Sequence, residues 1–167
     1  MLHLVDSTDP VLREQTLSFE FDQNIVDTEQ LVSEMTKTMQ TYHGIGLAGP
    51  QVNVSLAVFT MGWDDKFTAF FNPKIINTSN DLVNFDEGCL SFPGLVLRIA
   101  RPSEVEVEYQ NTKGDTVNDR LTGLEARVFQ HELDHLNGIC FDKKVSRLKL
   151  EMAKKRLEKM KRKLKDV

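Results

Sequence analysis

The chain has 167 residues, of which 40% are hydrophobic and 28% are charged, and this is the composition of a single globular domain. No apolar run approaches the roughly 20 residues of a membrane-spanning helix, and no basic-then-apolar leader opens the chain, so we expect a cytoplasmic protein with no membrane partner. Two cysteines are too few for the disulfide framework of a small secreted protein, and they leave Cys89 available as a metal ligand.

The net charge of −4 is distributed unevenly. Residues 143–167 contain 12 Lys/Arg and 3 Asp/Glu, a net charge of +9, while the other 142 residues contain 9 and 22, a net charge of −13. An acidic body with a basic tail suggests an attached element that has its own polyanionic partner. We expect a monomer.

The first elements predicted are helical. Asp9-Pro10 marks an early turn or the first turn of a short helix. A longer helix is expected over residues 28–42, because apolar side chains recur at helical spacing at Leu31, Met35, Met39 and Tyr42. Gly44 follows and is expected to end this helix.

The middle of the chain has the pattern of β structure. Across residues 104–109 (EVEVEY), glutamate alternates with valine or tyrosine, which is typical of a half-buried antiparallel strand. Residues 111–115 are expected to form a hairpin turn around Gly114. Strands are predicted over residues 55–60, 67–71, 84–87, 95–99, 105–109 and 117–121.

Two helices are predicted in the last third. The first covers residues 124–136 and ends at Asn137-Gly138. The second covers residues 147–165, with apolar residues at alternating steps of three and four: Leu150, Ala153, Leu157, Met160 and Leu164. We therefore expect an α+β fold. Antiparallel β-sheets would wrap around the central helix, with one helix near the N-terminus and a basic helix at the C-terminus.

Residues 131–135 (HELDH) carry the strongest functional signal. His131 and His135 lie four residues apart on the central helix, so both imidazoles face one side and can reach one divalent metal. Glu132 then lies beside a metal-bound water as a candidate general base. Leu124 and Val128 fall on the same stripe, so this predicted metal-binding face continues into an apolar face.

A catalytic metal usually has three protein ligands and one open position. The best upstream candidate is Cys89 in residues 87–91 (EGCLS), at the end of a predicted strand and beside a glycine. A thiolate with two imidazoles suits zinc or ferrous iron. The alternative is that Cys89 is simply a small buried side chain.

Residues 44–51 (GIGLAGPQ) form a third segment of interest. The simplest interpretation is a turn between a helix and a strand. A phosphate-binding loop is not favoured, because no Lys-Ser/Thr pair follows the glycines. Gln51 offers a side-chain donor that a polarised carbonyl could use.

Together the three segments resemble the motifs of the peptide deformylases. In that family a glycine-rich first motif ends in Gln, the second motif reads EGCLS and the third reads QHExDHLxG. The resemblance covers about residues 9–144 and is specific, because three independent motifs agree in order and rough spacing. It implies a catalytic domain over residues 1–146, extended by the basic helix over residues 147–167. Where the family usually has two alanines, this chain has Ala48-Gly49, and the glycine is expected to loosen the loop by up to ~1 kcal/mol relative to alanine.

The resemblance implies removal of the formyl group from the N-terminal formylmethionine of new polypeptides, with release of formate. Cys89, His131 and His135 would hold the metal, with a water in the fourth position as nucleophile. Glu132 would take a proton from that water and later deliver one to the leaving amine. The family tends to use Fe²⁺ and accepts Zn²⁺, Ni²⁺ or Co²⁺.

The resemblance also assigns roles around the reacting carbonyl. The Leu90 backbone amide and the Gln51 side chain would donate to the tetrahedral oxyanion. Gly46, next to Ile45, would pair with the substrate backbone. The pocket for the methionine side chain would be lined in part by Leu124 and Val128.

Two other functions use some of the same signals. A metallopeptidase with an HExxH helix usually draws its third ligand from a downstream Glu or His. Here no histidine follows His135, and Glu151 and Glu158 lie in the basic tail. A metal-stabilised RNA-binding module would need a closed site with four ligands, and no good fourth ligand is evident.

The basic tail has two interpretations. It is either a solvated amphipathic helix that packs a narrow apolar stripe on the body, or a contact for a polyanion. For a deformylase the natural polyanion is ribosomal RNA near the exit of the nascent chain, and related bacterial enzymes are thought to use a C-terminal helix in this way. A membrane-surface helix is not favoured, because the apolar face is thin and has no tryptophan.

Overall fold

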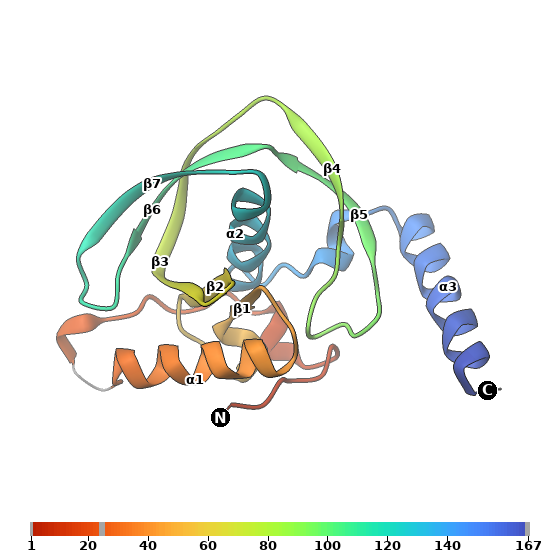
Figure 1. Cartoon of the computed structure of the whole chain (residues 1–167), viewed down its shortest axis with the longest axis horizontal. Coiled ribbons are helices and arrows are strands. Elements are labelled where there is room, and N and C mark those ends of the chain that lie inside the picture. The colour runs from red at the N-terminus through yellow and green to blue at the C-terminus, as the bar shows by residue number, and fades with distance from the viewer. Residues whose placement is uncertain (1, 24–25, 166–167) are drawn as a thin grey trace.

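The computed structural model describes residues 2–23 and 26–165 and has an α+β fold (Figure 1). One antiparallel sheet has the strand order β1-β2-β3-β6-β7, and β4 and β5 form a separate antiparallel hairpin. The expected α+β class and antiparallel pairing are confirmed. The strands are β1 (Gly46–Ala48), β2 (Val58–Trp63), β3 (Lys66–Thr78), β4 (Leu82–Glu87), β5 (Leu97–Pro102), β6 (Glu104–Gln110) and β7 (Thr116–Thr122). The helices are α1 (Thr28–Thr41), α2 (Gly123–Leu136) and α3 (Arg147–Lys165), with short 3-10 segments η1 (Pro10–Arg13), η2 (Phe21–Gln23), η3 (Gly49–Val52) and η4 (Phe141–Lys144).

Helix α2 lies at the centre, enclosed by the curved strands (Figure 1). Its inner face belongs to the largest apolar cluster, in which Phe129 packs edge-on against Phe59 and Phe70 at centroid distances of 5.2 and 5.4 Å. Aromatic rings in this geometry add to the stability gained from burial alone. The helix that carries the HELDH run is therefore held on a rigid base.

Helix α1 covers the edge of the sheet near β1 and β2. Asp27 caps its first turn, accepting a hydrogen bond from the Gln30 backbone amide at 2.9 Å. Gly44 was expected to end this helix, and the helix ends at Thr41, three residues before it; the left-handed conformation after the helix is taken by His43, with φ 56°. Gly44 instead donates its amide to the Met39 carbonyl at 2.9 Å, and a Cβ on it would lie 2.6 Å from the Leu90 side chain.

The predicted strands occur with shifted bounds. Residues 55–57 are not part of β2, because they pair with the N-terminal segment: Ala57 donates to the Leu17 carbonyl at 2.7 Å. The short β1 was missed, since a glycine-rich run of three residues shows no alternation. The predicted hairpin turn over residues 111–115 is present, with the Asn111 amide donating to the Asp115 carbonyl at 3.0 Å. Asp64 and Asp65 connect β2 to β3 with positive φ values of 49° and 62°, as a two-residue hairpin requires.

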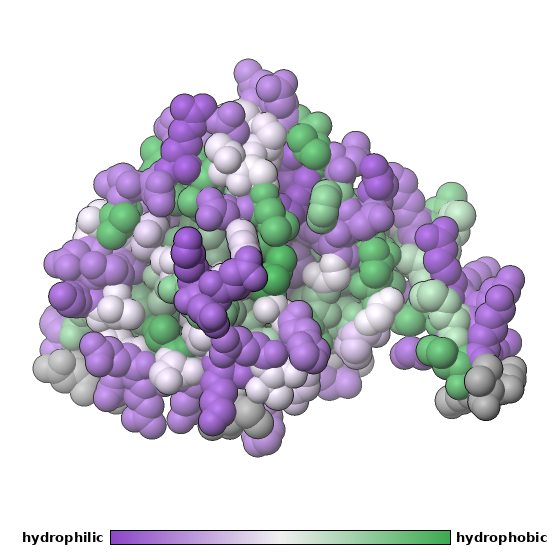
Figure 2. Space-filling view, viewed as in Figure 1, coloured by the Kyte–Doolittle hydropathy of each residue, from purple (hydrophilic) through white to green (hydrophobic). Residues whose placement is uncertain are grey.

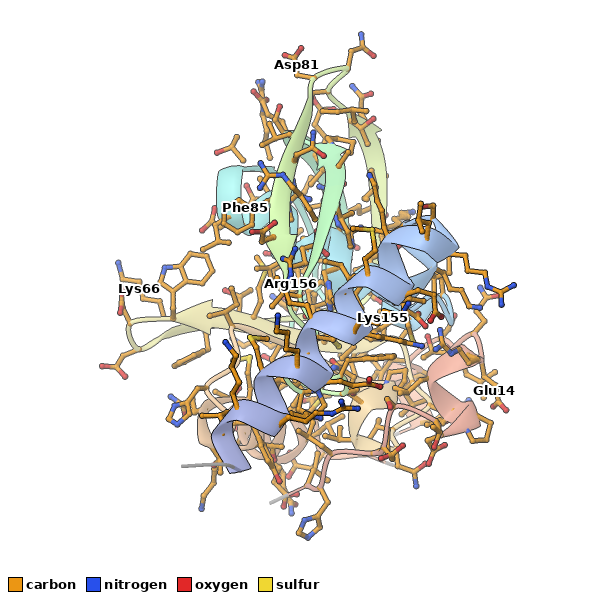
Figure 3. The ribbon with its side chains drawn as sticks, turned by 90° about the vertical axis from the view of Figure 1, so that its right-hand side faces the viewer. Glu14, Lys66, Asp81, Phe85, Lys155 and Arg156 are labelled. Carbon is orange, nitrogen blue, oxygen red and sulfur yellow. The ribbon has the colours of Figure 1, made fainter. Side chains whose placement is uncertain are left out.

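Helix α3 has the bounds predicted for it, and only its first half packs on the body. Leu150, Ala153 and Leu157 contact the cluster formed by β5 and η4, whereas Met160 and Leu164 are exposed. Figure 2 shows the end of this helix projecting beyond the body, with hydrophilic and hydrophobic side chains both at its surface. Figure 3 shows α3 running lengthwise over one side of the molecule, with Lys155 and Arg156 on it. None of the described helices is long and apolar enough to cross a membrane.

Candidate active site

A cleft of about 480 Å³ lies between the segment that precedes β1, the end of β4 and the outer face of α2. Nearly all of the residues predicted from the sequence line it. The one exception is His135, which is 1% exposed and lies behind the cleft wall. The predicted residues in the lining are Ile45, Gly46, Gln51, Cys89, Leu90, Leu124, Val128, His131 and Glu132.

Cys89, His131 and His135 converge on one point. One ligand atom from each of the three lies within 4.8 Å of the others, and the Cys89 Sγ atom is 3.2 Å from His135 Nε2. The histidines meet because they are one turn apart on α2, while Cys89 arrives from the loop that follows β4. This donor set suits a tetrahedral metal with one open position. Within the described part of the chain, the buried His135 Nδ1 has no hydrogen-bond partner.

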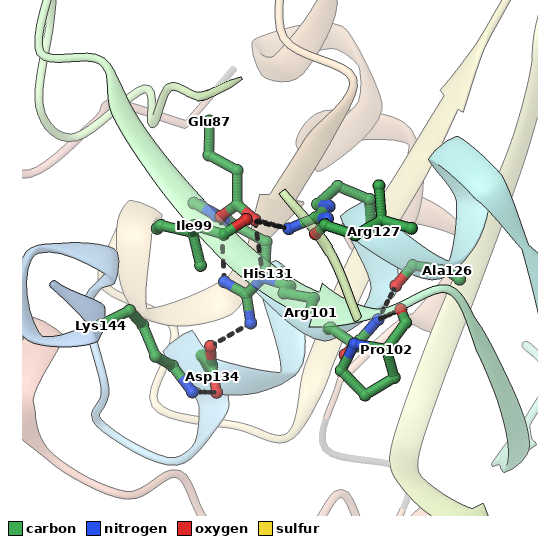
Figure 4. A network of polar contacts seen from close by, with 11 residues as sticks. Glu87, Ile99, Arg101, Pro102, Ala126, Arg127, His131, Asp134 and Lys144 are labelled. Carbon is green, nitrogen blue, oxygen red and sulfur yellow. Dashed lines mark hydrogen bonds and ion pairs between the residues drawn. The ribbon is translucent and has the colours of Figure 1, made fainter. Parts of the chain in front are cut away.

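Glu87, the last residue of β4, holds the first of the two histidines. Its Oε2 lies 3.0 Å from His131 Nδ1, so this carboxylate fixes the ring and leaves Nε2 for a metal (Figure 4). Arg101 on β5 secures the carboxylate with two hydrogen bonds, from Nε at 2.7 Å and from Nη2 at 3.0 Å. We did not predict either role. Glu87 stands inside the EGCLS motif, which was a usable signal, whereas nothing in the sequence marks Arg101.

The same network extends to the C-terminal end of α2. Arg101 Nη1 donates to Asp134 Oδ2 at 2.7 Å, and Lys144 Nζ lies 2.9 Å from the other oxygen of Asp134 (Figure 4). Asp134 is the fourth residue of the HELDH run. Asp134, which is not a proposed metal ligand, thus ties α2 to the β4–β5 hairpin and to η4.

Burial and hydrogen bonding shift the pKa values of Glu87, His135 and His131. Burial alone would raise the pKa of Glu87, but hydrogen bonds from His131 and two arginines hold it well below its usual range. Burial lowers the pKa of His135, which favours the neutral imidazole that a metal requires. Burial also works against the charge on His131, yet its contacts with Cys89 and Glu87 outweigh this and raise its pKa to about 10, so a metal that binds this imidazole would have to displace a proton from it.

Glu132 lies against the β1 backbone. It is 4% exposed, and its Oε2 has no hydrogen-bond partner among the described residues. Burial raises its pKa to about 7, the range suited to a group that exchanges protons at neutral pH. A Cβ on Gly46 would lie 2.2 Å from Glu132 Oε1, so only glycine at this position admits the carboxylate.

Gln51 points its amide nitrogen toward the thiol. The Ala48 backbone amide donates to Gln51 Oε1 at 2.8 Å, which directs Nε2 toward Cys89 Sγ at 3.4 Å and Ser91 Oγ at 3.2 Å. Leu90, the residue after Cys89, also lines the cleft. The amide of Gln51 and the segment of Leu90 thus border the same cleft as Cys89 and His131.

Gly49 is closely packed within the glycine-rich segment. It is buried at the start of η3, and a Cβ on it would lie 2.6 Å from the Val54 carbonyl oxygen and 3.0 Å from that of Leu56. Its own carbonyl accepts a hydrogen bond from the Val54 amide at 2.9 Å. Backbone oxygens thus crowd this position so closely that a side chain would be hard to accommodate, which argues against the expected loosening of the loop.

Known proteins share both sequence and fold with the chain. The family model for polypeptide deformylase matches residues 1–151. A peptide deformylase from Thermotoga maritima is 41% identical over 150 residues, covering 89% of this chain and 90% of the relative. Peptide deformylase 1B of Arabidopsis thaliana, described as chloroplastic/mitochondrial, is 38% identical over 168 residues, covering 97% of this chain and 60% of the relative.

The solved structures agree. A peptide deformylase from Synechococcus elongatus in complex with actinonin has a TM-score of 0.86 at 37% identity, covering 94% of this chain and 86% of that one. The Thermotoga maritima structure has a TM-score of 0.81 at 39% identity, covering 87% and 98%. The chain therefore belongs to the peptide deformylase family, the enzymes that remove the formyl group from the N-terminal formylmethionine of new polypeptides.

Proposed function

We propose that Cys89, His131 and His135 hold one divalent metal in the cleft and that the formylated N-terminus of a polypeptide binds beside it. The proposal rests on the convergence of ligand atoms from these three residues on one point and on the place of Glu132 in the adjoining cleft of a deformylase fold. A metal bound there would lower the pKa of a coordinated water and polarise the formyl carbonyl. Proton transfer, stabilisation of the oxyanion and substrate binding are assigned to the residues around the metal.

Glu132 is proposed as the general base and acid. Its buried carboxylate has a free oxygen and a pKa of about 7, so it can accept a proton from water and return it to the leaving amine. Gly46 keeps this carboxylate close to β1, because no other residue leaves space for it. The proton carrier is thereby held in one position through both transfers.

Gln51 and the Leu90 backbone amide are proposed as donors to the oxyanion. The Oε1 atom of Gln51 is already occupied by the Ala48 amide, so its Nε2 is oriented before substrate arrives. Preorganised donors of this kind contribute about 3 kcal/mol each to stabilising a tetrahedral intermediate.

Four lining residues are proposed to bind the substrate. Leu124 and Val128 lie on the cleft side of α2 and offer an apolar wall to the methionine side chain. Ile45 and Gly46 come from the segment that enters β1, where an extended peptide could run alongside the backbone. The cleft volume of about 480 Å³ is large enough for a methionine side chain with the groups on either side of it.

Fe²⁺ is proposed as the native metal, with Zn²⁺, Ni²⁺ and Co²⁺ as ions that the site also accepts. One thiolate and two imidazoles form a donor set of intermediate softness, which suits all four of these ions. Metal analysis of protein purified without oxygen from its own source tests the choice, because Fe²⁺ bound to a thiolate is readily lost to oxidation. Zinc as the main ion in such protein would contradict it.

The function is tested by comparing two substrates on oxygen-free, metal-loaded protein. We expect formate release from formyl-Met-Ala and no cleavage of an internal peptide bond in a blocked peptide. Metal content measured on the same sample should be one ion per chain. Internal cleavage would support a metallopeptidase, and neither reaction from fully metal-loaded protein would support a binding module.

The basic helix α3 is proposed to bind ribosomal RNA near the nascent-chain exit. Every Lys and Arg from Arg147 to Lys163 is exposed, and such clusters bind polyanions with an affinity that falls steeply with salt. Because Leu157 packs on the body, substitution tests this better than deletion. Changing Lys159, Arg162 and Lys163 to Gln should weaken ribosome cosedimentation at low salt. The same change at the exposed Lys37, Lys66 and Lys113 is the control, and equal loss in both would contradict the proposal.

Cytoplasmic location and a monomeric state are also part of the proposal. The bacterial relatives support the first, while two plant relatives are described as chloroplastic or chloroplastic/mitochondrial. Fractionation of the source cells tests the location. Light scattering at several protein concentrations tests the oligomeric state, and a mass of twice 19.1 kDa would contradict a monomer.

A further inference from the structure

Arg127 is a buried cation in the wall of the cleft to which the reaction assigns no role. It stands on α2 one turn before His131, on the same face of the helix. Its side chain is 8% exposed, so its charge is stabilised by specific partners in place of water. Those partners belong to the hairpin β4–β5, and they include the carboxylate that holds His131.

The guanidinium of Arg127 makes three hydrogen bonds. Nη1 donates to Glu87 Oε1 at 2.9 Å and to the Ile99 carbonyl at 2.9 Å, and Nη2 donates to the Val83 carbonyl (Figure 4). Planar guanidinium groups hold several acceptors in a fixed relation, which a point charge on a flexible stem does not. Arg127 therefore fastens the Glu87 carboxylate to the backbone of both strands of the hairpin.

The two carboxylate oxygens of Glu87 have different sets of partners. Oε1 accepts from Arg101 Nε and Arg127 Nη1, while Oε2 accepts from Arg101 Nη2 and faces His131 Nδ1. Arg101 holds both oxygens of the carboxylate, and its remaining nitrogen, Nη1, is held in turn by Asp134. Arg127 adds a second donor on Oε1 and ties this oxygen to the backbone of β4 and β5, which fixes the carboxylate relative to the hairpin and thus the direction of Oε2.

We propose that Arg127 is a positioning residue for the metal centre. It clamps Glu87 against the β4–β5 hairpin so that Oε2 orients the imidazole of His131 toward the metal. This inference rests on the proposed ligand role of His131. Some residues support a metal-bound histidine without contacting the metal. Removing such a residue typically changes metal affinity or activity by about 10- to 100-fold.

The test measures metal affinity by competition with a chelator and the visible absorption spectrum of the Co²⁺-loaded protein. Arg127→Gln should weaken metal binding by about 10- to 100-fold and shift the cobalt bands, because the histidine ligand is no longer held in one orientation. Arg127→Lys keeps the charge and can reach Glu87 but not both carbonyls as well, so we expect part of the affinity to be recovered.

Arg98→Gln is the matched control. Arg98 lies on the same hairpin and pairs with Asp86, but it is exposed and does not touch Glu87. This variant should keep the affinity and the cobalt spectrum of the unchanged protein. If Arg127→Gln does not fold, Arg127→Lys carries the test, and an unaltered affinity and spectrum in that variant would overturn the proposal.

A merely structural role gives a different result. Both Arg127 variants would then unfold at lower urea concentration but bind metal with unchanged affinity and spectrum, and the proposal would be wrong. Failure of the proposed metal site itself is recognised separately, because the unchanged protein would then bind no metal that depends on Cys89.

Discussion

Helices α2 and α3 use charge in opposite ways. On α2, Arg127, His131 and Asp134 each have a partner at 2.7–3.0 Å, and the helix is buried against both sheets. On α3, the cations from Arg147 to Lys163 are exposed, and only one apolar stripe packs on the body. Charge on α2 fixes the position of individual atoms, whereas charge on α3 creates a field around the helix. Single substitutions should therefore act strongly on the first and weakly on the second.

The largest effect is expected at the thiolate. Cys89→Ala removes one of three ligands, so the metal content should fall from about one ion per chain to near zero, and formate release should fall with it. Atomic absorption on dialysed protein measures this. Cys140→Ala is the control, because its buried Sγ donates to the Leu12 carbonyl and lies apart from the cleft. Unchanged metal in Cys89→Ala would place the third ligand elsewhere.

The next effect concerns the space left for Glu132. In Gly46→Ala the new Cβ would lie 2.2 Å from Glu132 Oε1, so the carboxylate must move away from β1. Displacement of a proton-transfer group by about 1 Å costs on the order of 100-fold in rate. We expect that loss in kcat with one metal ion still bound. Full turnover in this variant would show that Glu132 need not stay where the structure has it.

A substitution at Gly49 tests the packing of the glycine-rich segment and leaves the proposed catalytic and metal-binding side chains unchanged. Gly49→Ala would place a Cβ against the carbonyl oxygens of Val54 and Leu56, and overpacking of this kind costs about 1–3 kcal/mol of unfolding free energy. Urea denaturation measures it. The opposite sign, a gain of about 0.4–1 kcal/mol from a less flexible unfolded chain, would show that the backbone can open at this point.

The smallest effects are expected on α3. Leu157 packs on the body, so Leu157→Ala should cost about 1–2 kcal/mol, less than for a fully buried leucine. Leu164 is 79% exposed, and Leu164→Ala should stay within about 0.5 kcal/mol of the unchanged protein. Thermal unfolding of the two variants compares them directly. Equal losses would mean that the last turns of α3 also pack on the body in solution.

Local patterns predicted much of the molecule. The bounds of α3 and the pairing of His131 with His135 follow from helical spacing alone. The shift of β2 could not be predicted, because residues 55–57 are taken by a contact with Leu17, 38 or more residues earlier. Pairing between segments so distant in the chain leaves no periodic signal in either of them.

The site, like the fold, has parts that the sequence predicts and parts that it does not. The three proposed ligand residues and Glu132 lie in short motifs that can be recognised directly in the sequence. The clamp on Glu87 comes from Arg101 and Arg127, which stand 14 and 40 residues away at no characteristic spacing. Gly49 likewise looked like a source of flexibility, because the carbonyl oxygens that crowd it come together only in the folded chain. The residues that support the site are thus brought together only by tertiary packing, whereas the proposed ligands can be recognised in local sequence motifs.

The central claim is that Glu132 moves the protons while Cys89 and the two histidines hold the metal. The most direct test is Glu132→Gln, which keeps the shape of the side chain and removes its basicity. Metal content and formate release from formyl-Met-Ala are measured on the same oxygen-free sample. We expect one metal ion per chain and the loss of nearly all turnover. Retained turnover with metal bound would contradict the account.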